Sequence, residues 1–336
     1  MNDKEAMNVT ESGPGGPARR AARLLAAPVG AVRGAVHGVR HAYRLYHPPQ
    51  SRVGRTPENK GLSVRPMRVV TSRDRIPLAA WVVPGKGPHT VVVCHGVERS
   101  RSSTLGHIEM LHRAGHHVVA YDMRNHGESG GDRRIGRMAV RYTSDLLDVL
   151  RSVAADPEVG GGRLAVLGFS FSAWPALYVL REAGPPVSAV ITDSGPMFDI
   201  PSGLGAFADL RRGSLPEHLR APVAFGAYRW AFRTAALRML GLKEWPPDLS
   251  HVPARLMFVA GGEDFVVPQE QVGRVARCFP GAEFWVAPHA MHMNAIRFDR
   301  QEYRTRVLEF LSAAFAAGDE PSGEVVPLHG TEGHGR

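Results

Sequence analysis

Short apolar runs rich in β-branched residues recur along the chain from about residue 63, separated by segments with helical periodicity. The apolar runs cover residues 66–71, 77–83, 89–95, 117–122, 163–169, 187–192, 255–260 and 283–287. The helical segments cover about 102–114, 138–155, 171–183, 268–278 and 300–316. Strands that alternate with helices form a mostly parallel sheet with helices on both faces, so the pattern predicts an eight-stranded α/β fold. The first two runs lie close together with Ser72-Arg73-Asp74-Arg75 between them, which predicts an antiparallel hairpin at one edge.

One gap in this alternation, between residues 192 and 255, is too long for a simple loop. It contains six large aromatic residues, Phe207, Phe225, Tyr228, Trp230, Phe232 and Trp245. Structureless loops of this length are uncommon in compact domains. We therefore expect residues 196–252 to form a helical cap over the carboxyl edge of the sheet, within an α/β domain that covers residues 61–318.

The segment of residues 21–50 precedes this domain and has helical periodicity of its own. Its apolar residues recur at spacings of three and four and comprise Leu25, Val29, Val32, Val36, Val39, Tyr43 and Tyr46. A second face carries Arg33, His37, Arg40, His41 and Arg44, and a third strip carries Gly30, Gly34 and Gly38. This pattern predicts an amphipathic helix that packs on the protein's own surface or on a second copy, or else lies on an anionic membrane. We expect residues 1–20, which are polar and rich in Gly and Pro, to be disordered, and residues 319–336 to form a flexible tail.

Charge and cysteine content narrow the partners and the compartment. The formal net charge is +9 and the pI is about 10.0. The arginines that carry this charge are scattered, and no aromatic-rich basic module accompanies them, so we expect no nucleic-acid partner. Two isolated cysteines, Cys94 and Cys278, do not suggest a disulfide framework, and the first twenty residues lack the pattern of a secretory signal. We predict a cytoplasmic protein, with the inner membrane surface as the alternative location, and no metal or cofactor.

A strand that runs directly into the sequence Gly168-Phe169-Ser170-Phe171-Ser172 is the strongest chemical motif. A nucleophilic serine needs a sharp strand-to-helix turn, and small residues two positions before and after it allow the strand and helix to approach. We predict Ser170 as the nucleophile, with Ser172 as its rival. The backbone amides of Phe171 and of Val97, which follows His95-Gly96 after another strand, are the predicted oxyanion donors. We expect His95 itself to be structural.

Two later strands end in residues that complete this chemistry. Asp264 lies just after the apolar run 255–260, where a carboxylate orients an imidazole; Glu263 and Asp193 are alternatives. His292 lies in the loop after the run 283–287 and is the predicted base, with His289 as the alternative.

The order Ser, Asp, His along the chain resembles that of the α/β-hydrolase superfamily, across about residues 63–316. The segment Asp122-Met123-Arg124-Asn125-His126-Gly127-Glu128-Ser129 is similar to a structural loop that follows the fourth strand in that family. The resemblance is strongest to serine hydrolases and esterases with an N-terminal helix, the BEM46-like or dienelactone-hydrolase-like group. Met291 stands where the family often has glycine before its catalytic histidine.

This resemblance implies a serine hydrolase that cleaves a carboxylic ester or thioester of a small-molecule acyl substrate through an acyl-enzyme. The predicted cap adds Arg211, Arg212, Arg220, Arg229, Arg233 and Arg238, which either form a cationic rim for an anionic acyl substrate or cover a solvated helix surface. The alternatives are acyl transfer, C–C cleavage or elimination of an acylated alcohol by the same residues, or a hydrolase-like binding module without catalysis.

Overall fold

The structure is a computed structural model that describes residues 17–50, 53–242 and 244–317. The predictions of disorder for residues 1–16 and of a flexible tail for 319–336 lie outside the described residues. Helix α1 runs from Pro17 to Tyr46. The predicted helix start at residue 21 was therefore four residues late, because residues 17–20 are already helical.

The predicted sheet is confirmed. Its strands are β1 (Arg65–Val70), β2 (Pro77–Val83), β3 (Thr90–Cys94), β4 (His117–Tyr121), β5 (Leu164–Phe169), β6 (Val187–Asp193), β7 (Arg255–Gly261) and β8 (Glu283–Ala287). They lie in the order β1-β2-β4-β3-β5-β6-β7-β8. Strand β2 is antiparallel to β1 and β4, and the remaining pairs are parallel. This is the mostly parallel sheet with an antiparallel edge that the strand–helix alternation predicts.

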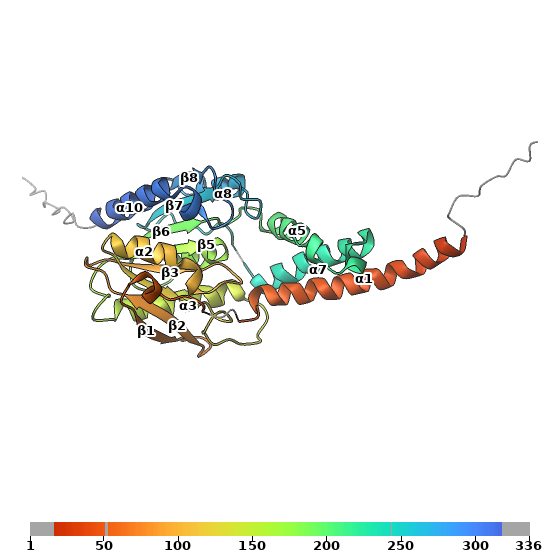
Figure 1. The fold of residues 1–336 in the computed structure, drawn as a ribbon, viewed down its shortest axis with the longest axis horizontal. Coiled ribbons are helices and arrows are strands. Elements are labelled where there is room, and N and C mark those ends of the chain that lie inside the picture. The colour runs from red at the N-terminus through yellow and green to blue at the C-terminus, as the bar shows by residue number, and fades with distance from the viewer. Residues whose placement is uncertain (1–16, 51–52, 243, 318–336) are drawn as a thin grey trace, which may run out of the picture.

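Helices cover both faces of this sheet (Figure 1). They are α2 (Leu105–Arg113), α3 (Met138–Ala154), α4 (Ala173–Tyr178), α8 (Gln269–Ala276), α9 (Ala295–Phe298) and α10 (Arg300–Ala316). Short 3-10 helices lie at Pro57–Lys60, Arg101–Thr104, Ser170–Ser172, Val179–Arg181 and Arg212–Ser214. Alternate residues of β3 belong to opposite cores, with Val92 and Cys94 packed among α3 and α4, and Val91 and Val93 among α2 and α10. A strand covered on both faces in this way is apolar throughout, which explains its continuous run of apolar residues.

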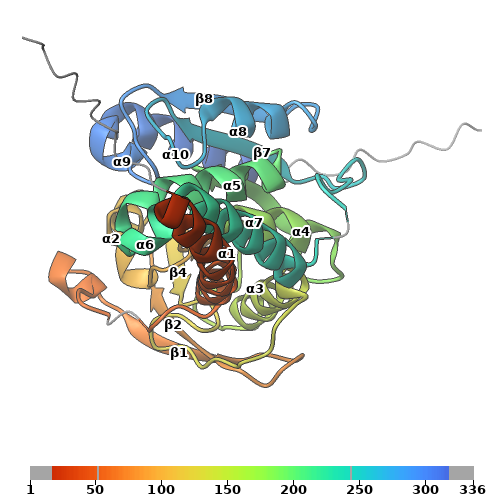
Figure 2. The same ribbon diagram turned by 90° about the vertical axis from the view of Figure 1, so that its right-hand side faces the viewer.

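Between β6 and β7 the chain forms α5 (Ile200–Leu210), α6 (Glu217–Arg220) and α7 (Pro222–Leu240). We call α1, α5, α6 and α7 together the arm. Figure 1 shows α1 and α7 side by side, projecting away from the rest of the molecule, which we call the body, and Figure 2 looks along them from their outer end. In the predicted cap, α5 packs on α7, and α7 runs beside α1 from its outer end to the body (Figure 1).

Glycines, not the valines, make the contact between α1 and α7. A Cβ atom added to Gly34 would lie 2.0 Å from the carbonyl oxygen of Ala224, and one added to Gly38 would lie 2.4 Å from that of Tyr228. The four valines of the predicted apolar face lie in solvent instead, with exposed fractions of 51% for Val29, 64% for Val32, 50% for Val36 and 46% for Val39. The helix therefore packs on the protein's own surface, but through its small-residue strip.

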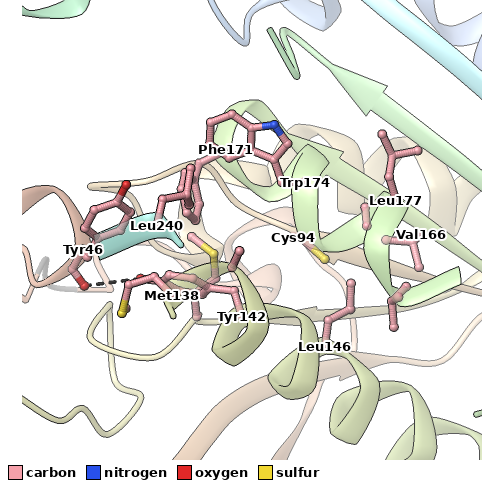
Figure 3. Packing of buried hydrophobic residues seen from close by; sticks show 14 of the residues in the cluster. Tyr46, Cys94, Met138, Tyr142, Leu146, Val166, Phe171, Trp174, Leu177 and Leu240 are labelled. Atoms are coloured by element: carbon pink, nitrogen blue, oxygen red, sulfur yellow. Dashed lines mark hydrogen bonds between the residues drawn. The ribbon is translucent and has the colours of Figure 1, made fainter. Parts of the chain in front are cut away.

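The inner end of α1 joins the arm to the body. Tyr46 is buried and its hydroxyl donates a hydrogen bond of 2.9 Å to the carbonyl of Ala236 in α7. Its ring lies edge-on to Phe171, whose ring also contacts Tyr142 of α3 (Figure 3). Because Phe171 directly follows Ser170, the end of the N-terminal helix packs against the turn that carries the predicted nucleophile.

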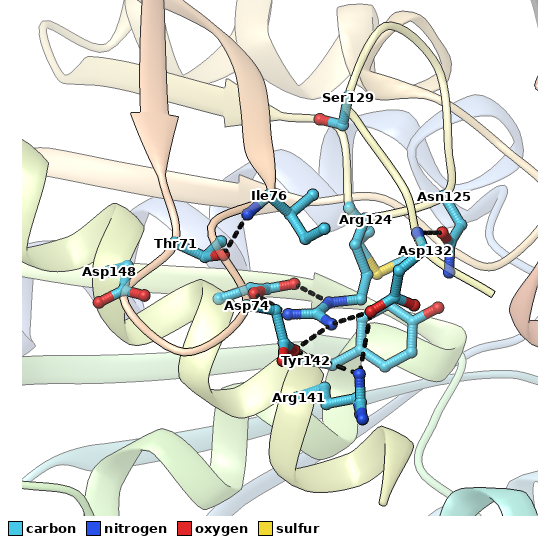
Figure 4. Close-up of polar contacts among 12 residues, drawn as sticks. Thr71, Asp74, Ile76, Arg124, Asn125, Ser129, Asp132, Arg141, Tyr142 and Asp148 are labelled. Carbon is cyan, nitrogen blue, oxygen red and sulfur yellow. Dashed lines mark hydrogen bonds and ion pairs between the residues drawn. The ribbon is translucent and has the colours of Figure 1, made fainter. Parts of the chain in front are cut away.

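The loop after β4 holds a buried ion-pair network (Figure 4). The fully buried guanidinium of Arg124 forms two hydrogen bonds of 2.6 Å to Asp145 of α3 and one of 2.7 Å to Asp74 in the β1–β2 turn. Arg141 extends the network to Asp132 at 3.0 Å. Since buried charges need partners on every side, this network fixes the hairpin, the loop and α3 relative to one another, which is a structural role.

Candidate active site

Ser170 lies at the turn between β5 and α4 in a conformation that residues with side chains rarely adopt. Its φ is +51°, a left-handed value. The turn is tight, because a Cβ atom on Gly168 would lie 2.8 Å from the carbonyl oxygen of Ser172, and one on Gly195 would lie 2.7 Å from that of Ser170. Such a strained turn exposes the serine hydroxyl at the edge of the sheet.

Ser172 is not a comparable nucleophile. Its side chain is fully buried, and its hydroxyl donates a hydrogen bond to the carbonyl oxygen of His95. His95 in turn accepts a hydrogen bond of 3.1 Å from the amide of Met123 through Nε2, so its Nδ1–H donates to the carbonyl of Gly96 at 2.7 Å. Burial lowers the pKa of His95 to about 4, which keeps this imidazole neutral and structural, as predicted.

Three predicted residues meet at the carboxyl edge of the sheet. His292 Nε2 lies 2.9 Å from the Ser170 hydroxyl, and His292 Nδ1 lies 2.8 Å from Asp264 Oδ2. The carboxylate accepts only, so Nδ1 carries the proton and Nε2 accepts from the serine. The second oxygen of Asp264 accepts hydrogen bonds of 2.9 Å from the amides of Val266 and Val267, which hold the carboxylate in place.

The structure does not bring the alternative residues into this series. Glu263 and His289 are exposed, and the amide of His289 contacts Asp299. Asp193 is fully buried, and burial raises the pKa of its carboxyl to about 6. Asp193 Oδ1 accepts a hydrogen bond from Ser194, and the imidazole of His292 bonds to Asp264 instead.

Ser194 helps to position the loop that carries His292, a role that the sequence analysis did not predict. Its hydroxyl donates to Asp193 Oδ1 at 2.9 Å and accepts a hydrogen bond of 2.7 Å from the amide of Met293. Met293 follows His292 directly, so this relay holds the histidine loop over the sheet. Ser194 and Met293 both have positive φ, of 59° and 56°, a backbone feature that sequence periodicity does not indicate.

A cavity of about 440 Å³ opens over Ser170 and His292. Its wall is mainly apolar and comprises Leu45, Val97, Phe171, Trp174, Met197, Leu204, Phe207, Val266, Val267 and Met293, with Glu98 and Arg99 as its charged members. The two predicted oxyanion donors, Val97 and Phe171, both line it. Within the described part of the chain, neither of their amides donates a hydrogen bond.

The arm forms one side of this cavity through Leu45 of α1 and Leu204 and Phe207 of α5. None of the six arginines predicted as a cationic rim lines it. Arg211 pairs with Glu98 at 2.6 Å and Arg229 pairs with Asp209 at 2.9 Å. These two charges are therefore neutralised by ion pairs at the surface of the arm. The alternative interpretation, that the arginines cover a solvated helix surface, fits the structure. The contribution of Leu45 was missed because it lies far from the other cavity residues in sequence.

A serine hydroxyl, an imidazole and a carboxylate in hydrogen-bonded series, at the carboxyl edge of a mostly parallel sheet, define a Ser-His-Asp site on an α/β fold. A sequence model of the alpha/beta hydrolase family matches residues 91–304. The chain belongs to this family.

Individual relatives agree with this assignment. The uncharacterized protein YqkD of Bacillus subtilis is 25% identical over 235 residues, which are 68% of this chain and 73% of that protein. The structure is similar to that of the esterase Pf2001 of Pyrococcus furiosus, with a TM-score of 0.64, 26% identity, and coverage of 80% of this chain and 97% of the other. An esterase from Exiguobacterium antarcticum shares the fold at 18% identity and a TM-score of 0.56, covering 74% of this chain and 100% of the other.

Proposed function

We propose that this protein hydrolyses carboxylic esters through a covalent acyl-enzyme. The observation that carries the proposal is the hydrogen-bonded series from Ser170 through His292 to Asp264, with distances of 2.9 and 2.8 Å, at the floor of an open cavity. Similarity to the esterase Pf2001 supports the same activity.

In the first half of the reaction, the Ser170 oxygen attacks the acyl carbon while His292 Nε2 takes the hydroxyl proton. Asp264 stabilises the imidazolium that forms and holds its tautomer. The amides of Val97 and Phe171 donate to the oxyanion of the tetrahedral intermediate. His292 then gives its proton to the leaving alkoxide, and the acyl group remains on Ser170.

In the second half, water takes the place of the alcohol. His292 accepts a proton from this water as its oxygen attacks the acyl carbon, and the proton passes to Ser170 as the acid leaves. Thioesters carry an acyl carbon of the same geometry and are the second substrate class for this site.

The cavity wall supports an apolar acyl group of moderate size. Its volume of about 440 Å³ lies in the lower part of the range for small-molecule sites, and apolar side chains dominate the wall. Glu98 pairs with Arg211 at the boundary of arm and body, whereas Arg99 forms no ion pair within the described ranges. Arg99 is therefore the charged group that we expect to contact a polar leaving group.

The test uses p-nitrophenyl esters of graded acyl length and a fluorophosphonate probe that labels activated serines. Ser170→Ala is expected to abolish both turnover and labelling, whereas Ser172→Ala keeps labelling because its hydroxyl is buried and bonded to His95. Labelling that persists in Ser170→Ala would show a different nucleophile. Absence of turnover and labelling in the correctly folded parent would exclude the proposed activity.

A further inference from the structure

We propose that the arm docks on an anionic lipid surface through the valine face of α1 and the adjoining side of α7. This face comprises Val29, Val32, Val36, Val39 and Trp230, and we call it the docking face. The inference does not depend on the proposed ester hydrolysis.

The docking face is apolar and exposed along residues 29–39 of α1. Val32 is 64% exposed and Trp230 is 60% exposed. Val39 and Trp230 line one shallow groove of about 480 Å³ together with Ile135, which is 65% exposed, so the apolar surface continues from α1 to α7 and to the loop before α3. Contiguous apolar surface of this kind marks an interaction site.

The rotation of α1 prevents these valines from turning inward. Gly34 and Gly38 approach the backbone of α7 so closely that no side chain fits between the helices. Rotating α1 to bury Val36 would replace glycine with valine at this contact. The glycine strip therefore fixes the apolar face outward, and the four valines stay in solvent unless another surface covers them.

Positive charge surrounds the docking face. Arg33, Arg40 and Arg44 of α1 are exposed, and among the described residues none of them forms an ion pair. Arg238 lines the groove beside Trp230. Neither Pro17–Tyr46 nor Pro222–Leu240 contains an aspartate or a glutamate.

This charge pattern selects lipid over a second copy of the chain. Two docking faces brought together would oppose arginine to arginine, with no carboxylate on α1 or α7 to neutralise them. Anionic headgroups neutralise the arginines while the valines enter the headgroup–acyl boundary, and tryptophan favours that depth. In the part of the chain that the structure describes, none of the helices combines the length and the hydropathy of a membrane span.

The experiment measures sedimentation of the full chain with phosphatidylcholine vesicles, with and without phosphatidylglycerol. We expect binding that requires phosphatidylglycerol and weakens with salt. Because each basic residue contributes about 1 kcal/mol near such a surface, Arg33→Glu combined with Arg40→Glu is expected to weaken binding by more than about tenfold. Val32→Ser combined with Val36→Ser is expected to weaken it similarly.

The matched control is Arg300→Glu combined with Arg304→Glu, which makes the same charge change on exposed positions of α10. The control should bind vesicles like the parent, and circular dichroism should be unchanged in all variants. Equal loss in the control would overturn the proposal, because net charge alone would then explain binding. Absence of phosphatidylglycerol-dependent binding would also overturn it. So would a dimer of the parent that becomes monomeric on Val32→Ser and Val36→Ser substitution without any vesicle binding, which would assign the face to a second copy.

Discussion

The body and the arm use similar apolar patterns in opposite ways. In the body, every residue of β3 and β4 is buried by the protein's own helices. In α1, valines at helical spacing remain in solvent, and the buried strip consists of small residues such as Gly34, Gly38 and Ala42. Apolar periodicity therefore identifies the type of element, whereas the face that packs is decided by which residues let two backbones approach.

The largest expected effect is a loss of turnover from a substitution in the body. Exchanging one carboxylate for an amide at the edge of the sheet should reduce ester hydrolysis and leave the arm in place. Asp264→Asn turns an amide N–H₂ toward His292 Nδ1, because the side-chain oxygen stays with the amides of Val266 and Val267. Nδ1 must then accept, so Nε2 carries the proton and the imidazole no longer holds the tautomer that accepts from Ser170. We expect kcat for p-nitrophenyl esters to fall about 10³–10⁴-fold. The side-chain oxygen can still accept from the amides of Val266 and Val267, so the loop is expected to remain folded.

The matched control is Asp193→Asn, which exchanges the second buried carboxyl near the site. Its oxygen still accepts from Ser194, so turnover is expected to change less than about tenfold, well below the loss expected for Asp264→Asn. A larger loss in Asp193→Asn than in Asp264→Asn would identify Asp193 as the group that orients the imidazole.

The sequence predicts the body closely because each strand and helix is buried by neighbours that follow the same rules. Strand-to-helix turns at the carboxyl edge also place Ser170, Asp264 and His292 together by topology alone, since parallel strands end at one edge. What sequence reasoning missed depends on contacts between distant segments. The approach of Gly34 to Ala224, the place of Leu45 in the cavity and the Ser194–Met293 bond are set by packing of the arm and by backbone angles.

The next largest effect tests the arm itself. Alanine at Gly38 would place its Cβ 2.4 Å from the carbonyl oxygen of Tyr228 and 2.8 Å from the amide nitrogen of Phe232. Both are backbone atoms of α7 that cannot step aside, so we expect Gly38→Ala to lower the free energy of unfolding by about 3 kcal/mol, the upper part of the range for overpacking. Urea denaturation followed by circular dichroism measures this loss.

Gly226 of α7 provides the control of opposite sign. A Cβ atom there meets nothing within 4 Å, and the position is exposed. Gly226→Ala is expected to stabilise the protein by about 0.5–1 kcal/mol through helix propensity alone. If both substitutions stabilise, α1 and α7 do not pack through glycine, and the contrast between arm and body fails.

The smallest expected effect is a difference between the body and the arm in how stability depends on pH. His107 is buried against Phe169 and Tyr303 in the body, and burial lowers the pKa of its imidazole to about 3. In the unfolded chain the imidazole of His107 takes up a proton near pH 6.5, whereas in the folded state it does so only near pH 3. Protons therefore bind preferentially to the unfolded chain, and the free energy of unfolding falls as the pH drops through this window. At pH 5 this costs about 2 kcal/mol, which His107→Phe removes.

The measurement is the difference in unfolding free energy between His107→Phe and the parent, which should rise by about 2 kcal/mol from pH 8 to pH 5. Asp145 and Asp193, whose carboxyl pKa values burial raises to about 6, act in the opposite sense, but they are present in both proteins and cancel in the difference.

His41 of α1 is the counterpart in the arm. It is half-buried, its Nδ1 lies 2.9 Å from the Tyr228 hydroxyl, and burial lowers the pKa of its imidazole as well. Because solvent still reaches His41, His41→Phe should change the pH dependence less than His107→Phe. An equal change would mean that protonation destabilises the arm as strongly as the body. The contact between α1 and α7 would then exclude water as completely as the core around His107.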